Sequence, residues 1–132
     1  MALKPYQLSN RTREKNFWRK YGISNPKSAP DSWIHFGSRM GCTTDEDLYH
    51  FTNRIKKAEI VIPGENEVTN EGISYLARLK GLRELDLKNL LIDDECLPDL
   101  TKIKTLEWLH IRSTKISSAG VERILEELPA LK

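Results

Sequence analysis

The residues of this sequence best suited to chemistry are three histidines, two cysteines and the pair Asp86 and His110, which are 24 positions apart. If Asp86 and His110 lie on neighbouring parallel strands, about 4.8 Å apart, their side chains can touch. An aspartate beside a histidine can exchange protons with a substrate. This pair is therefore the first candidate for acid–base catalysis.

No catalytic or metal-binding motif accompanies the pair. The sequence has no H-E-x-x-H, C-x-x-C, G-x-S-x-G or P-loop motif. Without a nucleophile or a cleft, an Asp–His pair on an open sheet is typical of a surface. We therefore expect no enzyme, no catalytic residue, no metal site and no cofactor. Cys96 falls at the repeat position of Gly72 and Gly120, which predicts a small, unreactive core residue.

The elements that carry these residues recur about every 24 positions. The pattern Leu-x-x-Leu-x-Leu at 82–87 returns as Leu-x-x-Leu-x-Ile at 106–111. Each unit begins with alternating apolar residues, which predicts a strand with one buried face. Four units are expected, with strands near Ile34, Ile60, Leu85 and Leu109.

A helix is predicted after each of the last three strands. Thr69, Asp93 and Ser117 stand where a side-chain oxygen can accept hydrogen bonds from the first N–H groups of a helix. Apolar residues then recur every three or four positions, as on the inner face of a helix. They are Ile73, Leu76 and Leu79; Leu97, Leu100 and Ile103; and Val121, Ile124 or Leu125, and Leu128. One such unit cannot cover its own apolar face, so neighbouring units must stack.

These residues resemble the leucine-rich-repeat superfamily in its short variant, over about residues 33–132. The resemblance implies an α/β fold: a short right-handed solenoid with a parallel sheet on its concave face, helices on its convex face and a helical N-terminal cap. The family's usual Asn after the strand is Leu90 in one unit and Thr114 in the next. The loop after Leu87 is therefore expected to be looser.

The concave sheet is the expected binding surface, since a rigid sheet loses little entropy when it binds a partner. Its outward columns are predicted to be Trp33, Glu59, Glu84 and Trp108; His35, Val61, Asp86 and His110; and Gly37, Pro63, Lys88 and Arg112. We predict non-enzymatic protein binding, of an adaptor, inhibitor, immunity or assembly-factor type. Its contact residues are expected to be Glu84, Asp86, Lys88, Trp108, His110 and Arg112.

The head of the chain, residues 1–31, lies outside the repeat, and its first 30 residues carry a net charge of +6. Residues 58–132 carry −4. Ser9 and Asn10 can cap a helix that runs to Tyr21, with Gly22 as its stop. The head can serve as a cap on the repeat domain at 32–132, packed there through Phe17, Trp18 and Tyr21 or through its charge.

Two other roles stay open for the head. Its low acidity also suits a targeting segment. The alternative function is nucleic-acid binding, in which cations neutralise phosphates and an aromatic ring stacks on bases. The residues for that role are Arg11, Arg13, Lys15, Trp18, Arg19 and Lys20.

Length and composition narrow the class. The chain of 132 residues is 30% charged and 39% hydrophobic, which fits one globular domain. No apolar run is long enough to span a membrane, and no secretory signal is evident. Two cysteines, Cys42 and Cys96, are too few for a disulfide framework, so we expect an intracellular, cytoplasmic protein.

Overall fold

The structure is a computed structural model that describes residues 10–37, 43–63 and 68–132. Four strands alternate with helical segments along the chain. The elements are α2 (Asn10–Arg19), η1 (Pro26–Ser28), β1 (Ser32–Gly37), α3 (Asp45–Arg54), β2 (Lys57–Ile62), α4 (Asn70–Leu76), β3 (Glu84–Asp86), η3 (Asp94–Cys96), α5 (Leu97–Leu100), β4 (Trp108–His110) and α6 (Ser118–Glu127). Ser9 and Cys42, which the sequence analysis singled out, lie outside the described residues.

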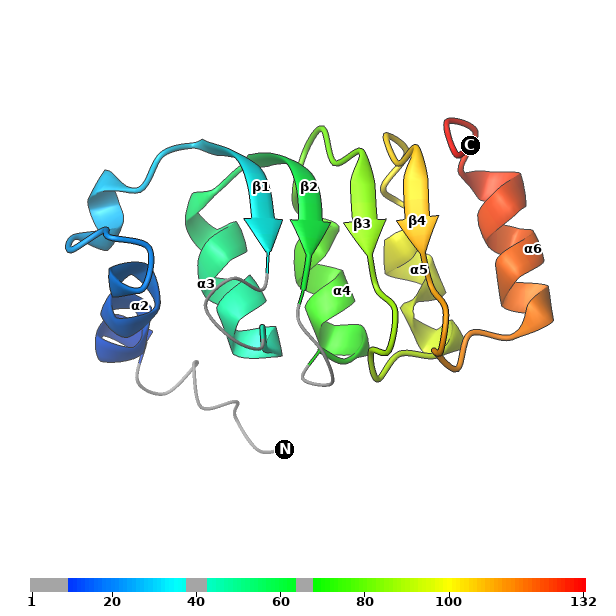
Figure 1. The fold of residues 1–132 in the computed structure, drawn as a ribbon, viewed down its shortest axis with the longest axis horizontal. Helices are drawn as coiled ribbons and strands as arrows, with labels where there is room; N and C mark the ends of the chain where they lie inside the picture. Colours follow the sequence, from blue (N-terminus) through cyan, green and yellow to red (C-terminus); the bar gives the residue numbers. More distant parts are fainter. Residues whose placement is uncertain (1–9, 38–42, 64–67) are drawn as a thin grey trace.

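The four strands form one parallel sheet in the order β1-β2-β3-β4. Figure 1 shows α3, α4 and α5 behind the strands, α2 at the β1 end and α6 beyond β4. The apolar side chains of strands and helices fill the space between these two layers. The predicted α/β class with a parallel sheet is confirmed. The division into 1–31 and 32–132 stays a prediction, since Phe17 and Trp18 belong to the same hydrophobic core as the repeats.

The predicted helix caps are confirmed. Thr69 accepts a hydrogen bond from the Glu71 N–H, Asp93 from Glu95 and Ser117 from Gly120. The sequence left open whether Ile124 or Leu125 belongs to the inner face of the last helix. In the structure Ile124 is buried and Leu125 is 63% exposed. Thr44 and Asp47 form a reciprocal capping box at the start of α3.

A ladder of side-chain hydrogen bonds joins each cap to the preceding unit. In each case the first residue of one helical segment is hydrogen-bonded to the N-cap residue of the next helical segment. Asp45 accepts from the Thr69 N–H at 2.9 Å and from its hydroxyl at 2.5 Å. Asp94 accepts in the same way from Ser117, with its N–H at 2.8 Å.

The middle rung of this ladder has a different chemistry. Its N-cap is a carboxylate, Asp93, which has no proton to donate. The residue that faces it is Asn70, whose amide donates to Asp93 Oδ1 at 2.9 Å and accepts from the Asp93 N–H at 3.1 Å. The side chains at each junction therefore match one another as donor and acceptor.

The predicted register is wrong by one residue in the first half of the sheet. Leu85 pairs with Val61, not with Ile60, and Val61 pairs with Phe36. Because a slip of one residue turns each side chain to the other face, Val61 is buried rather than outward. Pro63, also predicted outward, is buried. Glu59 does not share a row with Glu84, which pairs with Ile60.

The first strand departs from simple alternation. Trp33, predicted outward, packs edge-on against Tyr21 and Phe51 at centroid distances of 5.8 and 5.9 Å. Ile34, predicted inward, is 70% exposed. The Trp33 ring packs into the aromatic cluster formed by Trp18, Tyr21 and Phe51. The next residue, Ile34, therefore lies on the surface.

The two loops after β3 and β4 have the same turn. Asn89 and Ser113, at equivalent repeat positions, both have positive φ, at 66° and 61°. Leu90 is buried after the first turn, and Thr114 donates to the Ile111 carbonyl after the second at 2.7 Å. The expectation that the Leu90 loop is looser is therefore not supported. Ile111, the last residue of the pattern at 106–111, is only partly buried.

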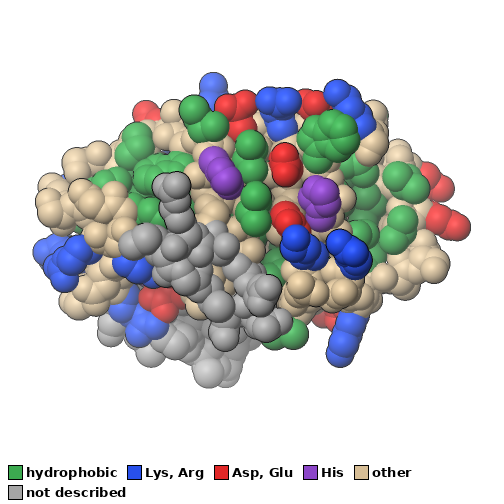
Figure 2. Space-filling view, in the orientation of Figure 1, with side chains coloured by type: hydrophobic (Ala, Val, Ile, Leu, Met, Phe, Trp, Pro, Cys, Tyr) green, Lys and Arg blue, Asp and Glu red, His purple; other side chains and the backbone are tan. Residues whose placement is uncertain are grey.

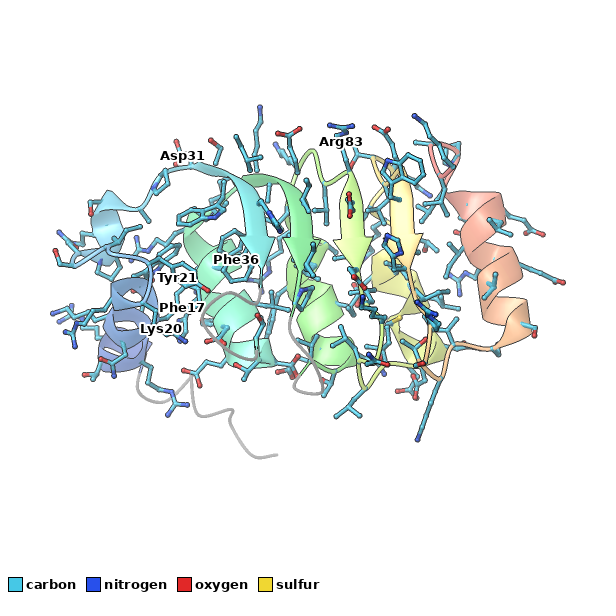
Figure 3. The ribbon with its side chains drawn as sticks, viewed as in Figure 1. Phe17, Lys20, Tyr21, Asp31, Phe36 and Arg83 are labelled. Atoms are coloured by element: carbon cyan, nitrogen blue, oxygen red, sulfur yellow. The ribbon has the colours of Figure 1, made fainter. Side chains whose placement is uncertain are left out.

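The N-terminal helix caps the β1 end of the core. Phe17 and Trp18 are 2% and 0% exposed, and Phe17 lies 6.3 Å from Phe36, centroid to centroid. Figure 3 shows Phe17 of α2 and Tyr21, in the turn that follows α2, directed toward Phe36 of β1. Burial and the nearby Asp47 carboxylate raise the pKa of Tyr21 to about 12. Phe17 and Trp18 are therefore part of the hydrophobic core, and Tyr21 packs against it.

Candidate binding surface

The sheet surface turned away from α3, α4 and α5 is called the open face here. One row of it runs across all four strands through His35, Ile60, Glu84 and Trp108. Figure 2 views this side and shows hydrophobic, acidic, basic and histidine side chains intermixed. Such a mixture gives a surface both apolar area and directional charge.

The six predicted contact residues lie together in the β3–β4 half of the open face. Glu84 pairs with Trp108 and Asp86 with His110 in the parallel ladder. Arg112 lies beside the turn after Lys88, since its carbonyl accepts from the Asn89 N–H at 3.0 Å. The predicted register is correct in this half. The assignment of a binding role to these residues remains a prediction.

Trp108 is the large apolar side chain of this half. It is 45% exposed, whereas Leu85 and Leu87, on the opposite face of the sheet, are fully buried. The Lys132 ammonium lies 5.8 Å from the centre of its ring, a cation–π distance. Lys132 is held there by its backbone N–H, which donates to the Glu107 carbonyl at 2.9 Å. The sequence analysis did not single out Lys132, although its N–H continues the series of backbone hydrogen bonds from Arg83 to Glu59 and from Glu107 to Arg83.

A charged row borders the open face at the start of the strands. Arg83 lies 3.3 Å from Glu59 and 3.1 Å from Glu107, and Lys132 lies 3.2 Å from Glu107. Figure 3 labels Arg83 at this edge. Hydrogen bonds from Lys132 and Arg83 lower the pKa of Glu107. These pairs are exposed, so each contributes little stability and mainly fixes the charge pattern beside Trp108.

The structure gives no support to acid–base chemistry at Asp86. Among the described residues, its hydrogen bond comes from the Lys88 N–H at 3.1 Å, and the Lys88 ammonium lies 3.6 Å away. His110 is exposed beside it. The described residues contain no cluster of three or more potential metal ligands.

Cys96 is a buried core residue, as predicted. Burial and the carboxylates of Asp93, Asp94 and Asp99 raise the pKa of its thiol to about 12. The reactive form of cysteine is the thiolate, so this environment keeps the group inert.

The structure separates the six residues that were predicted for nucleic-acid binding. Trp18 is fully buried and cannot stack on a base, so this part of the prediction is wrong. Arg13 is paired with Glu46, and Lys20 lies 3.5 Å from Asp47. Arg11, Lys15 and Arg19 are exposed.

Two of these cations, Arg13 and Lys20, form ion pairs with α3. Arg13 and Lys20 face the acidic first turn of α3, which precedes the acidic segment 58–132. On the far side of α2, both oxygens of Glu14 accept from Arg54 of α3, at 2.9 and 3.2 Å. Ion pairs of opposite polarity thus flank the aromatic contact.

Comparison with known protein families and with curated protein sequences finds no match to this chain. Among the described residues, no helix has the length and apolar character needed to cross a bilayer.

Proposed function

We propose that this chain is a short right-handed solenoid of leucine-rich-repeat type that binds a protein partner on its open face, concave in that fold. The 24-residue spacing of paired residues from Val61 to Leu85 to Leu109 supports the repeat. The observation that carries the binding proposal is Trp108, 45% exposed on the sheet surface that faces away from the helices. We expect the partner to dock over the β3–β4 half.

The side chains around Trp108 suit a protein partner. Trp and Arg are the side chains most often found as interface anchors. Arg112 offers a planar fork for a carboxylate, while Glu84 and Asp86 offer negative charge on the adjacent strand. Charges of both signs beside an apolar ring favour one partner over indiscriminate association. Protein binding by these side chains requires no catalysis, no metal and no cofactor.

Site-specific photo-crosslinking tests which face binds. A photoreactive residue is placed at Glu84 or Arg112 on the open face. As controls it is placed at Lys102, in the turn after α5, or at Glu122 of α6, both exposed. We expect a discrete protein adduct in the native cell from the first pair only. An adduct from the control positions, with none from the open face, would overturn the proposal.

Nucleic-acid binding remains a second candidate, favoured by the exposed cations Arg11, Lys15 and Arg19. It predicts retention on a polyanion column that falls steeply with salt. Because Trp18 is buried, such binding would rest on phosphate contacts alone. It would therefore show little preference for sequence.

A further inference from the structure

A hollow of about 350 Å³ lies where α2, η1 and the end of α3 meet. Its charged lining is Arg11, Glu14, Lys15, Lys27 and Arg54, and its neutral wall is Asn25 and Pro26. We call it the basic hollow. It is separate from the open face at β4, since α2 and β4 lie toward opposite ends of the molecule in Figure 1.

The charges of the basic hollow do not cancel. Glu14 is the single carboxylate among the described lining residues, and both its oxygens accept from Arg54. Arg11, Lys15 and Lys27 form no ion pair with a described residue and give the lining a net charge of +3. Like charges gathered in one place repel one another unless an anion lies between them.

Two cations close to the basic hollow are not part of its lining, because each is paired with a carboxylate. Arg13 of α2 and Lys20, in the turn just after α2, have carboxylate partners on α3. Arg11 and Lys15 are one helical turn apart and lie on the same side as Glu14. The helix therefore uses one side to attach to the acidic turn of α3 and presents the other to the hollow.

We propose that the basic hollow binds a phosphate monoester, a dianion, with its organic part against Asn25 and Pro26. The fork of Arg54, which would suit a carboxylate, is already occupied by Glu14. The two lysine ammonium groups and the exposed Arg11 remain, and these suit the three oxygens of a phosphate. The volume lies in the range of small-molecule sites, roughly 300–1,000 Å³, and exceeds the needs of a bare ion. This proposal is independent of the protein-binding function.

Titration of the full chain with glycerol 3-phosphate, followed by backbone amide NMR, tests the site. We expect saturable shifts at residues 11–15, 25–27 and 54. Dimethyl phosphate, with one negative charge, should bind at least tenfold more weakly. The triple variant R11Q/K15Q/K27Q should lose at least tenfold in affinity. The matched control K57Q/K80Q/K115Q, which removes the same charge from exposed positions elsewhere, should change it less than twofold.

A second experiment distinguishes a lipid headgroup from a soluble phosphate ester. Vesicles that contain phosphatidic acid present the same monoester on a membrane surface. Binding of these vesicles that depends on Arg11, Lys15 and Lys27 assigns the site to a lipid headgroup, and binding of the free ester alone assigns it to a soluble phosphate. Equal losses in the two triple variants, or no saturable shift with either probe, would overturn the proposal. So would binding of a single-stranded oligonucleotide alone.

Discussion

At the scale of residues, the ladder between helix starts shows how single side chains fix the stacking of the units. Asp45 and Asp94 face hydroxyl caps, and Asn70 faces the carboxylate cap Asp93. Gly120 is small for a related reason, since a Cβ there would lie 2.7 Å from Asp94 Oδ1. Each junction therefore depends on a matched pair rather than on one residue.

The variant Asn70→Asp tests this matching. It places a second carboxylate against Asp93 and removes the amide donor, so we expect a loss of about 1–2 kcal/mol in the free energy of unfolding. The double variant Asn70→Asp/Asp93→Ser recreates the Asp–Ser chemistry of the Asp94–Ser117 rung. It should recover most of that loss in urea denaturation. A double variant no more stable than Asn70→Asp would show that the match is not what stabilises this junction.

At the scale of elements, the sequence predicts the strands and helices well but places one strand in the wrong register. Caps and apolar spacing are local signals, and they located α4, α6 and all four strands. The run Ile60–Val61–Ile62 is apolar throughout, so it carries no alternation that could distinguish its two faces. Extending the 24-residue spacing backward from Leu85 would have selected Val61.

Other parts of the site depend on contacts that no local pattern contains. The position of Trp33 is decided by rings from α2 and α3, which are distant in sequence. The basic hollow joins α2 to Lys27 and Arg54, and repeat analysis does not include α2. The positions of the six proposed contact residues, on β3 and β4 or just after them, were predictable because both strands lie in the regular repeats.

The attachment of α2 to α3 should depend on pH. Hydrogen bonds from Arg13 and, more weakly, His50 lower the pKa of the Glu46 carboxyl below its usual value of 4.5, although burial acts in the opposite direction. A lowered folded-state pKa stabilises the protein above pH 4.5, and this contribution is lost as the pH falls through the folded-state pKa.

The variant Glu46→Gln removes that carboxylate. We expect a loss of about 1 kcal/mol at pH 7, reduced by solvent because the pair is partly exposed. Below pH 4.5 the difference from wild type should shrink. Chemical denaturation from pH 7 to pH 3 measures both effects, with the exposed Glu126→Gln as control. A constant difference across this range would contradict the assignment.

At the scale of the whole molecule, the two ends of the core are covered unequally. The β1 end is closed by α2, whose Phe17 and Trp18 are buried. At the other end, Leu109 and Ile111 are only partly buried, and Leu125 of α6 is 63% exposed. The cap at β1 should therefore be essential to the solubility of the fold.

Deletion of residues 1–31 tests the cap. It uncovers the aromatic side chains of β1 and α3 together with a strand edge, both of which promote aggregation. We expect an aggregated or unfolded product by size-exclusion chromatography. The milder variant Phe17→Ala should remain folded and lose about 3 kcal/mol in the free energy of unfolding. A soluble, monomeric truncation that melts like the full chain would show that the head is an appended arm.

The binding proposal depends most directly on Trp108, so the decisive measurement is the affinity of the purified crosslinked partner for Trp108→Ala. The matched control is Leu125→Ala, which trims an exposed apolar side chain on α6 instead. We predict that Trp108→Ala weakens binding by about 2 kcal/mol, roughly thirtyfold. Leu125→Ala should change it less than twofold, and both variants should keep the wild-type melting temperature. A folded Trp108→Ala variant that binds as tightly as wild type would contradict the account.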